Sequence, residues 1–214
     1  MKRLYITVLI VSSLLFIDKA QAQKFNAGLI VGPTFCQVDS PDEAYAGFHQ
    51  VGLTAGAYIN LPFEDYLSAQ MELKYSLLGA HSSHYEITER IPPLKPYSLR
   101  LHYAEIPLMF RCNLGFLRVH FLTLEAGASL DFRLRATEDV DGDFEVTTRR
   151  WNFFTATANA GVHFAIGKHF GAGARFMYSV VPCRFTGYSG WFHYQYYNKV
   201  IQFTLTYNIN SPLK

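Results

Sequence analysis

One pattern repeats from about Phe25 to Asn208: a segment of about ten residues in which every second side chain is apolar, closed by a tight turn or a longer polar loop. Between Val51 and Leu61, for example, the odd-numbered residues are apolar and the residues between them are polar or small. A period of two is typical of β-strands with one face against an apolar medium. Eight such segments predict an all-β chain that forms an eight-stranded antiparallel transmembrane β-barrel of the outer-membrane type, with up-and-down topology.

The eight predicted strands cover residues 25–36, 49–61, 66–78, 97–112, 117–135, 151–167, 170–182 and 196–209. The connections at residues 61–65, 113–116 and 167–169 are tight, whereas the other four are long. Outer-membrane barrels have short periplasmic turns and longer external loops. The alternation in length therefore predicts an outer-membrane location with both chain ends in the periplasm.

The chain begins with features of an export signal. Lys2 and Arg3 precede an apolar run over residues 4–17, and Ala20 and Ala22 supply the small-x-small cleavage pattern. We expect residues 1–22 to be a signal peptide and residues 23–214 to form the barrel domain. The net charge of +2 lies entirely in residues 1–22, so the mature chain is neutral and nucleic acid is not an expected partner.

The apolar face of each strand is predicted to meet lipid, and the polar face to line the lumen. A soluble lipocalin-like barrel would have the opposite arrangement, and its outer face would need charges on nearly every strand. Charged residues make up only 17% of the chain, and the polar face of segment 49–61 carries none. Gly, Thr, Ser and Asn on that face suit a narrow interior in which side chains interlock.

The parity of the apolar residues shifts at two places, within residues 105–107 and between residues 121 and 122. One inserted residue turns every later side chain of a strand to the other face. We therefore predict a β-bulge at each place, and the proline at position 107 fits a bulge because it cannot donate to the strand ladder.

A few charged residues interrupt the polar face, and their signs balance. Buried charges must be paired, so we predict an ion-pair network that fills the lumen, with a gated ion path as the alternative. A diffusion pore for solutes is not expected, because eight strands leave an interior that side chains just fill. The predicted network comprises Glu72, Lys74, Arg111, Glu125 and Arg175.

A motif lies in the middle of the chain. It consists of Tyr103, Ala104, Glu105, Ile106, Pro107 and Leu108, with Arg111 after it and Glu125, Ala126 and Gly127 beyond the next turn. It resembles the Tyr-x-Glu-Ile-Pro-Leu pattern of small outer-membrane β-barrel proteins of Bacteroidota, often labelled porin-family or PorT-like. The family's proline after the glycine is Ala128 here. The resemblance implies an eight-stranded barrel, and one branch of the family is associated with secretion across the outer membrane.

The third long loop contains alternating carboxylates around Gly142. Oxygen ligands of this kind could bind calcium; the candidates are Asp139, Asp141, Asp143 and Glu145. Asp141-Gly142 is also a type I′ turn signal, which predicts that the flanking strands continue past the membrane as a hairpin with acids at its tip.

The second long loop begins with His81, Ser82, Ser83, His84 and Glu86. A hydroxyl activated by His is the requirement of a hydrolytic site, as in barrel enzymes that modify lipid A. The two histidines could instead bind a metal, and all five residues are also ordinary in a loop.

Arginines and aromatic residues concentrate at the predicted outer rim. Arg133, Arg135, Arg149, Arg150 and Arg184 are expected to cluster there, where lipopolysaccharide phosphates are the natural counter-charge. The aromatic residues of the fourth loop suit either contact with a partner or an aromatic girdle; they are Phe185, Tyr188, Trp191, Phe192, Tyr194, Tyr196 and Tyr197.

Three cysteines enter an oxidising compartment, so at least one lacks an intramolecular partner. Cys36 and Cys183 are predicted at the same rim and could form a disulfide, whereas Cys112 lies at the opposite rim. The alternative is three buried or rim thiols.

These patterns favour a non-enzymatic outer-membrane protein with a filled lumen, whose extracellular loops have a structural or interaction role. The expected partners are outer-membrane lipid, lipopolysaccharide and a protein of the envelope or of a secretion machine; no cofactor is expected. The family resemblance supports a second hypothesis, an accessory component of outer-membrane protein secretion. A lipid A-modifying enzyme and a small-solute porin are weaker alternatives.

Overall fold

The computed structural model describes residues 25–39, 47–83, 87–89, 96–141, 143–145, 151–185 and 195–209. The predicted signal peptide, residues 1–22, lies outside the described residues. Within the described ranges, no helix has the length and apolar character needed to cross a membrane.

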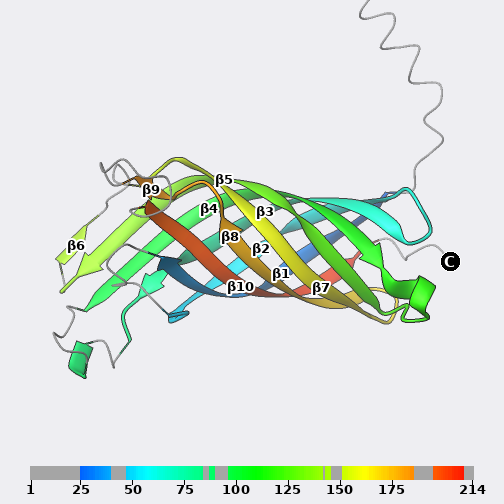
Figure 1. Ribbon diagram of the computed structural model, residues 1–214, viewed down its shortest axis with the longest axis horizontal. Helices are drawn as coiled ribbons and strands as arrows, with labels where there is room; N and C mark the ends of the chain where they lie inside the picture. Colours follow the sequence, from blue (N-terminus) through cyan, green and yellow to red (C-terminus); the bar gives the residue numbers. More distant parts are fainter. Residues whose placement is uncertain are drawn as a thin grey trace, which may run out of the picture.

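The described residues form eight long antiparallel strands in a closed barrel (Figure 1). Neighbours in sequence pair throughout, and the first strand pairs with the last. The strands are β1 (Asn26–Asp39), β2 (Gln50–Pro62), β3 (Leu67–His81), β4 (Tyr97–Asn113), β5 (Leu122–Val140), β7 (Phe154–Ile166), β8 (Phe170–Ser179) and β10 (Gln195–Asn208). The predicted all-β barrel with eight strands and up-and-down topology is confirmed.

The barrel has two different ends. The turn end, on the right in Figure 1, holds the connections at residues 63–66, 114–121 and 167–169, together with the start of β1 and the end of β10. One of these turns contains a 3-10 helix, η2 (Leu114–Leu117), whose first turn is capped by Asn113. The opposite loop end carries two short strands, β6 (Asp143–Glu145), which pairs with β5, and β9 (Arg184–Phe185), which pairs with β10.

Alternate side chains point outward or into the lumen, and the outward ones are apolar. The outward leucines Leu29, Leu53, Leu73, Leu108, Leu130 and Leu205 are between 47% and 64% exposed. Glu72, Lys74, Glu105 and Arg175 are buried at 4% exposure or less. A soluble barrel would not expose leucines and bury charges, so the predicted assignment of faces is confirmed.

The predicted bulge in β4 is wrong. β3 and β4 pair without any shift in register, and the odd-numbered residues of β4 face the lumen from Tyr97 to Met109. The apolar parity changes because the lumen itself changes: its lining is polar at Glu105 and apolar from Tyr103 to Tyr97.

The second predicted bulge is also wrong, because β5 begins at Leu122 and residue 121 belongs to the turn. A bulge does occur further along β5. His102 pairs with Arg135 and Tyr103 pairs with Arg133, so Leu134 is an extra residue in this strand.

Candidate functional site

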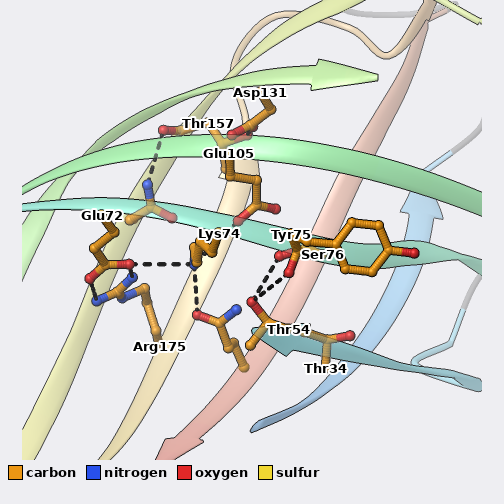
Figure 2. Close-up of polar contacts among 12 residues, drawn as sticks. Thr34, Thr54, Glu72, Lys74, Tyr75, Ser76, Glu105, Asp131, Thr157 and Arg175 are labelled. Carbon is orange, nitrogen blue, oxygen red and sulfur yellow. Dashed lines mark hydrogen bonds and ion pairs between the residues drawn. The ribbon is translucent and has the colours of Figure 1, made fainter. Parts of the chain in front are cut away.

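Arg175 is the centre of a polar network inside the barrel, and Figure 2 shows its contact with Glu72. It projects inward from β8, and its Nη1 and Nη2 each donate a hydrogen bond of 2.9 Å to Glu72 of β3. Its Nε and Nη2 also donate to Glu125 Oε1 of β5, at 3.1 and 2.9 Å. Because all three side chains are buried, these charge-assisted bonds compensate for the loss of hydration.

Lys74 extends the network toward the loop end (Figure 2). Its Nζ lies 3.2 Å from Glu105 Oε2 and 3.7 Å from Glu72 Oε2, and it donates a 3.0 Å hydrogen bond to Gln202 Oε1. One ammonium group thus links β3 to β4 and, across the lumen, to β10.

Arg111 extends the network toward the turn end. Its Nε lies 3.4 Å from Glu125 Oε2, and its Nη1 donates a 2.6 Å hydrogen bond to Gln70, which in turn donates to Glu72. The structure therefore brings all five predicted residues, Glu72, Lys74, Arg111, Glu125 and Arg175, into one connected set.

Two carboxylates in the lumen were not predicted. Glu105 and Asp131 are direct partners across β4 and β5, and both are buried. Asp131 accepts a hydrogen bond from Thr157, but its Oδ1 has no hydrogen-bond partner among the described residues. The sequence pattern did not identify Glu105 because this residue lies where the apolar parity shifts. Asp131 could have been identified, because it lies between the apolar residues Leu130 and Phe132 and therefore on the polar face.

Acidic groups outnumber basic ones on the described inner wall. The inward carboxylates are Glu72, Glu105, Glu125, Asp131 and Glu138, and the inward cations are Lys74, Arg111, Arg133 and Arg175. The described inner wall therefore carries one carboxylate in excess.

An apolar layer covers the network on its loop side. Leu99, Leu101 and Tyr103 are fully buried within it, and Trp151 packs edge-to-face on Tyr196 with ring centroids 5.8 Å apart. The other members are Cys36, Val38, Leu78, Ala80, Tyr97, Ala136, Met177, Cys183 and Val200. A charged core under an apolar cover suits a lumen that excludes ions and polar solutes.

Cys36 and Cys183 both lie in this layer as free thiols. The Cys36–Cys183 disulfide considered from the sequence is therefore not formed. Cys183 Sγ donates instead to the Tyr196 carbonyl oxygen at 3.2 Å. Cys112 is also a free thiol and lies half-buried near the turn end.

The predicted cluster of rim arginines is corrected by the described residues. Arg133 faces the lumen and donates from Nε to the Asn152 carbonyl oxygen at 2.9 Å. Arg184 lies over the Trp151 and Tyr196 rings, at 5.5 and 5.1 Å from their centroids. Only Arg135 among these three is exposed on the outer wall; Arg149 and Arg150 lie outside the described residues.

The aromatic residues of the fourth loop are only partly described. Tyr196 and Tyr197 are buried within β10 rather than displayed at the rim. The side chains of Phe185, Tyr188, Trp191, Phe192 and Tyr194 lie outside the description.

The acidic loop forms the predicted hairpin. Val140 pairs with Asp143 and Asp139 with Phe144, and Asp141 adopts a positive φ of 60° at the tip. Among the described side chains, no group of three or more His, Cys, Asp or Glu could hold a metal ion. The side chains of Asp143 and Glu145 are not among them, so the calcium site remains a prediction.

The candidate hydrolytic residues that the structure describes at the end of β3 point to different sides of the wall. His81 is exposed on the outer wall, and Ser82 Oγ both donates to and accepts from the backbone of Tyr97. Ser82 thus serves to join the ends of β3 and β4. His84 and Glu86 lie outside the described residues.

Comparison with known proteins agrees with this architecture. A family model described as outer membrane protein beta-barrel domain matches residues 20–182. Among solved structures, Ail, the attachment invasion locus protein of Yersinia pestis, aligns with a TM-score of 0.50 and 12% identity, over 87% of this chain and 99% of Ail. Neisserial surface protein A aligns with a TM-score of 0.55 and 10% identity, over 86% of this chain and 97% of that protein. These identities indicate a shared fold alone. The sequence matches no curated protein.

Proposed function

Because the chain belongs to the outer membrane protein β-barrel domain family, we propose that it is a non-enzymatic protein of the outer membrane whose filled barrel anchors an external interaction surface. Its turn end faces the periplasm, since short turns and both ends of the barrel chain gather there. Its loop end, with the β5–β6 hairpin, faces outward and contacts envelope lipid or protein.

The observation that carries this proposal is the filling of the lumen in two layers. The network around Arg175 neutralises most of its own charge, and Leu99, Leu101 and Tyr103 cover it toward the loop end. An eight-stranded barrel has space for little more than its own side chains. This favours a structural or interaction role over solute transport.

Planar-bilayer recording tests the proposal. We expect refolded mature protein to give no steady conductance at neutral pH, although it migrates on an unheated gel as a compact species that boiling converts to the unfolded form. A large general porin reconstituted in the same bilayer is the positive control. Steady, solute-permeable conductance of the unmodified barrel would replace this proposal with a porin function.

The position of Ser82 supports the non-enzymatic part of the proposal. Ser82 is 4% exposed, and its hydroxyl both donates to and accepts from the Tyr97 backbone, whereas a nucleophile needs a free path to substrate. Ser82→Ala is therefore expected to alter stability rather than to abolish a lipid A-modifying activity. Loss of deacylated lipid A in a strain that carries this variant would favour the enzyme instead.

The central motif supports a second candidate, an accessory role in protein secretion of the PorT-like kind. Its Tyr103 and Glu105 face the lumen and its Ile106 and Leu108 face lipid, so the motif contributes to the barrel wall. A deletion strain separates the candidates. An envelope defect with normal secreted proteins favours the structural role, whereas a selective loss of secreted proteins favours the accessory role.

A further inference from the structure

The bulge in β5 determines which side of the wall Arg135 faces. Arg133 faces the lumen at 6% exposure, and the extra residue Leu134 is 58% exposed on the outside. In a regular strand Arg135 would share the inner face with Arg133; the inserted residue turns it outward.

On the outer wall, Arg135 joins a basic patch formed by Arg100, His102 and Arg135. His102 of β4 pairs directly with Arg135, and Arg100 is the next outward residue of the same strand. The Tyr75 hydroxyl and His102 Nδ1 lie 2.5 Å apart, which fixes the imidazole ring against β3.

The surface beside Arg100 is open. Its partner on β3 is Gly79, where a side chain cannot be added because the φ of +145° is unfavourable and a Cβ would lie 2.0 Å from the Leu99 carbonyl oxygen. A cavity of about 110 Å³ lies next to Arg100 between β4 and β5 and is lined by Ser98, Arg100, Thr137 and Asp139. The cavity lies on the far side of Arg100 from His102, and Asp139 is the carboxylate in its lining.

The patch directly follows the apolar belt of the barrel. Tyr75, Ile106 and Leu134, on β3, β4 and β5, are 40%, 38% and 58% exposed. Beyond them, toward the loop end, the outward residues of β4 and β5 become His102, Arg135 and Arg100. Such a change marks the level at which lipid head groups replace acyl chains.

We propose that Arg100, His102 and Arg135 bind a phosphate group of an outer-leaflet lipid, whose acyl chains lie against Leu134 and Ile106. Guanidinium groups bind phosphate through paired, charge-assisted hydrogen bonds, and adjacent apolar wall selects a phosphate that carries acyl chains. The proposal deepens the proposed function, because it rests on the loop end facing outward.

The site is tested by measuring, with native mass spectrometry, how tightly lipid A binds to the refolded protein in zwitterionic micelles. The probes are lipid A with its phosphates, dephosphorylated lipid A and inorganic phosphate. The variants are Arg100→Gln/Arg135→Gln and, as a matched control, Lys199→Gln, which removes a cation from the same rim on β10.

We expect the double variant to weaken binding of phosphorylated lipid A about tenfold or more, since two charge-assisted contacts are lost. Lys199→Gln should bind as the unmodified protein does, and dephosphorylated lipid A should bind all three proteins equally weakly. Equal binding of phosphorylated lipid A to the unmodified protein and the double variant would overturn the proposal. So would inorganic phosphate binding as tightly as the lipid, because the apolar wall would then contribute nothing. Bilayer conductance is measured separately, so failure of the filled-barrel function can be distinguished from failure of this site.

Discussion

Arg175 on β8 donates two hydrogen bonds of 2.9 Å to Glu72 on β3, a strand on the opposite side of the barrel. Three strands separate β8 from β3 in either direction around the wall. The pair therefore links two opposite walls that no backbone hydrogen bond connects, and a second carboxylate, Glu125, fixes the same guanidinium from β5.

Removing Arg175 alone should lower the stability of the barrel more than removing Arg175 together with the charge of Glu72. Arg175→Met leaves two buried carboxylates short of a partner, and we expect the free energy of unfolding to fall by about 3 to 5 kcal/mol. Arg175→Met combined with Glu72→Gln should recover part of this loss. Denaturant unfolding in phospholipid vesicles measures both, and Lys199→Met, which breaks a surface pair with Asp39, should change stability by less than about 1 kcal/mol. Additive effects of the two lumen substitutions would mean that Arg175 and Glu72 are not energetically coupled.

The carboxylates of the lumen should differ in how much each contributes to stability. Asp131 is part of the acidic excess and has no ion pair among the described residues, whereas Glu125 contacts both Arg111 and Arg175. We expect Asp131→Asn to leave stability unchanged or to raise it, because burying a charge without a partner is costly. Glu125→Gln should lower the free energy of unfolding by about 1 to 3 kcal/mol. The same unfolding titration compares the two, and an equal loss in both variants would show that Asp131 is paired as well as Glu125.

The position of a residue along the outer wall should determine how much a lipid-facing charge at that residue lowers the free energy of unfolding. Leu108 is 61% exposed on β4, between Ile106 and Phe110 in the apolar belt. Leu108→Arg should cost about 2 to 4 kcal/mol, and Phe116→Arg, in the η2 turn, about 0 to 1 kcal/mol. Folding yield into vesicles and unfolding free energy both report this difference. Equal costs at the two positions would argue against the belt.

The three thiols should react at different rates. Cys36 and Cys183 are 1% and 0% exposed in the apolar layer, whereas Cys112 is half-buried near the turn end. Burial also raises the pKa of the Cys183 thiol, which lowers the fraction of reactive thiolate. A maleimide should therefore add once to the folded protein, at Cys112, and three times after denaturation. Mass spectrometry counts the adducts, and only a single adduct after denaturation without reductant would reveal a disulfide.

Much of the wall could be predicted from the sequence because its two faces differ chemically. Where lipid lies outside and Glu72, Lys74 or Glu125 lies inside, period-two alternation identifies both the strand and its face. The prediction failed along β4 because Leu99, Leu101 and Tyr103 line the lumen and are as apolar as lipid-facing residues. Alternation reports only which residues share a face, so a change in the lining of the lumen was mistaken for a bulge.

Contacts across the lumen were less accessible to prediction. The alternation placed Glu72 and Arg175 inside, but their partnership depends on the stagger between β3 and β8, which no local pattern records. The true bulge at Leu134 had a similarly weak signal, since the spacing of Arg133 and Arg135 fits a regular strand. The position of the inserted residue depends on how β5 pairs with β4, and the composition of either strand does not reveal it.

The pairing of β1 with β10 has a consequence for the order of folding. Gly28 pairs with Asn208 and Asp39 with Tyr197, so one edge of the first strand has no backbone partner until the last strand has formed. Until then the chain is an open sheet with two unprotected edges, which invite pairing with other chains. Loop closure over nearly the whole chain is entropically slow. The interval between the synthesis of β1 and that of β10 is therefore the period in which this chain is most exposed to pairing with other chains.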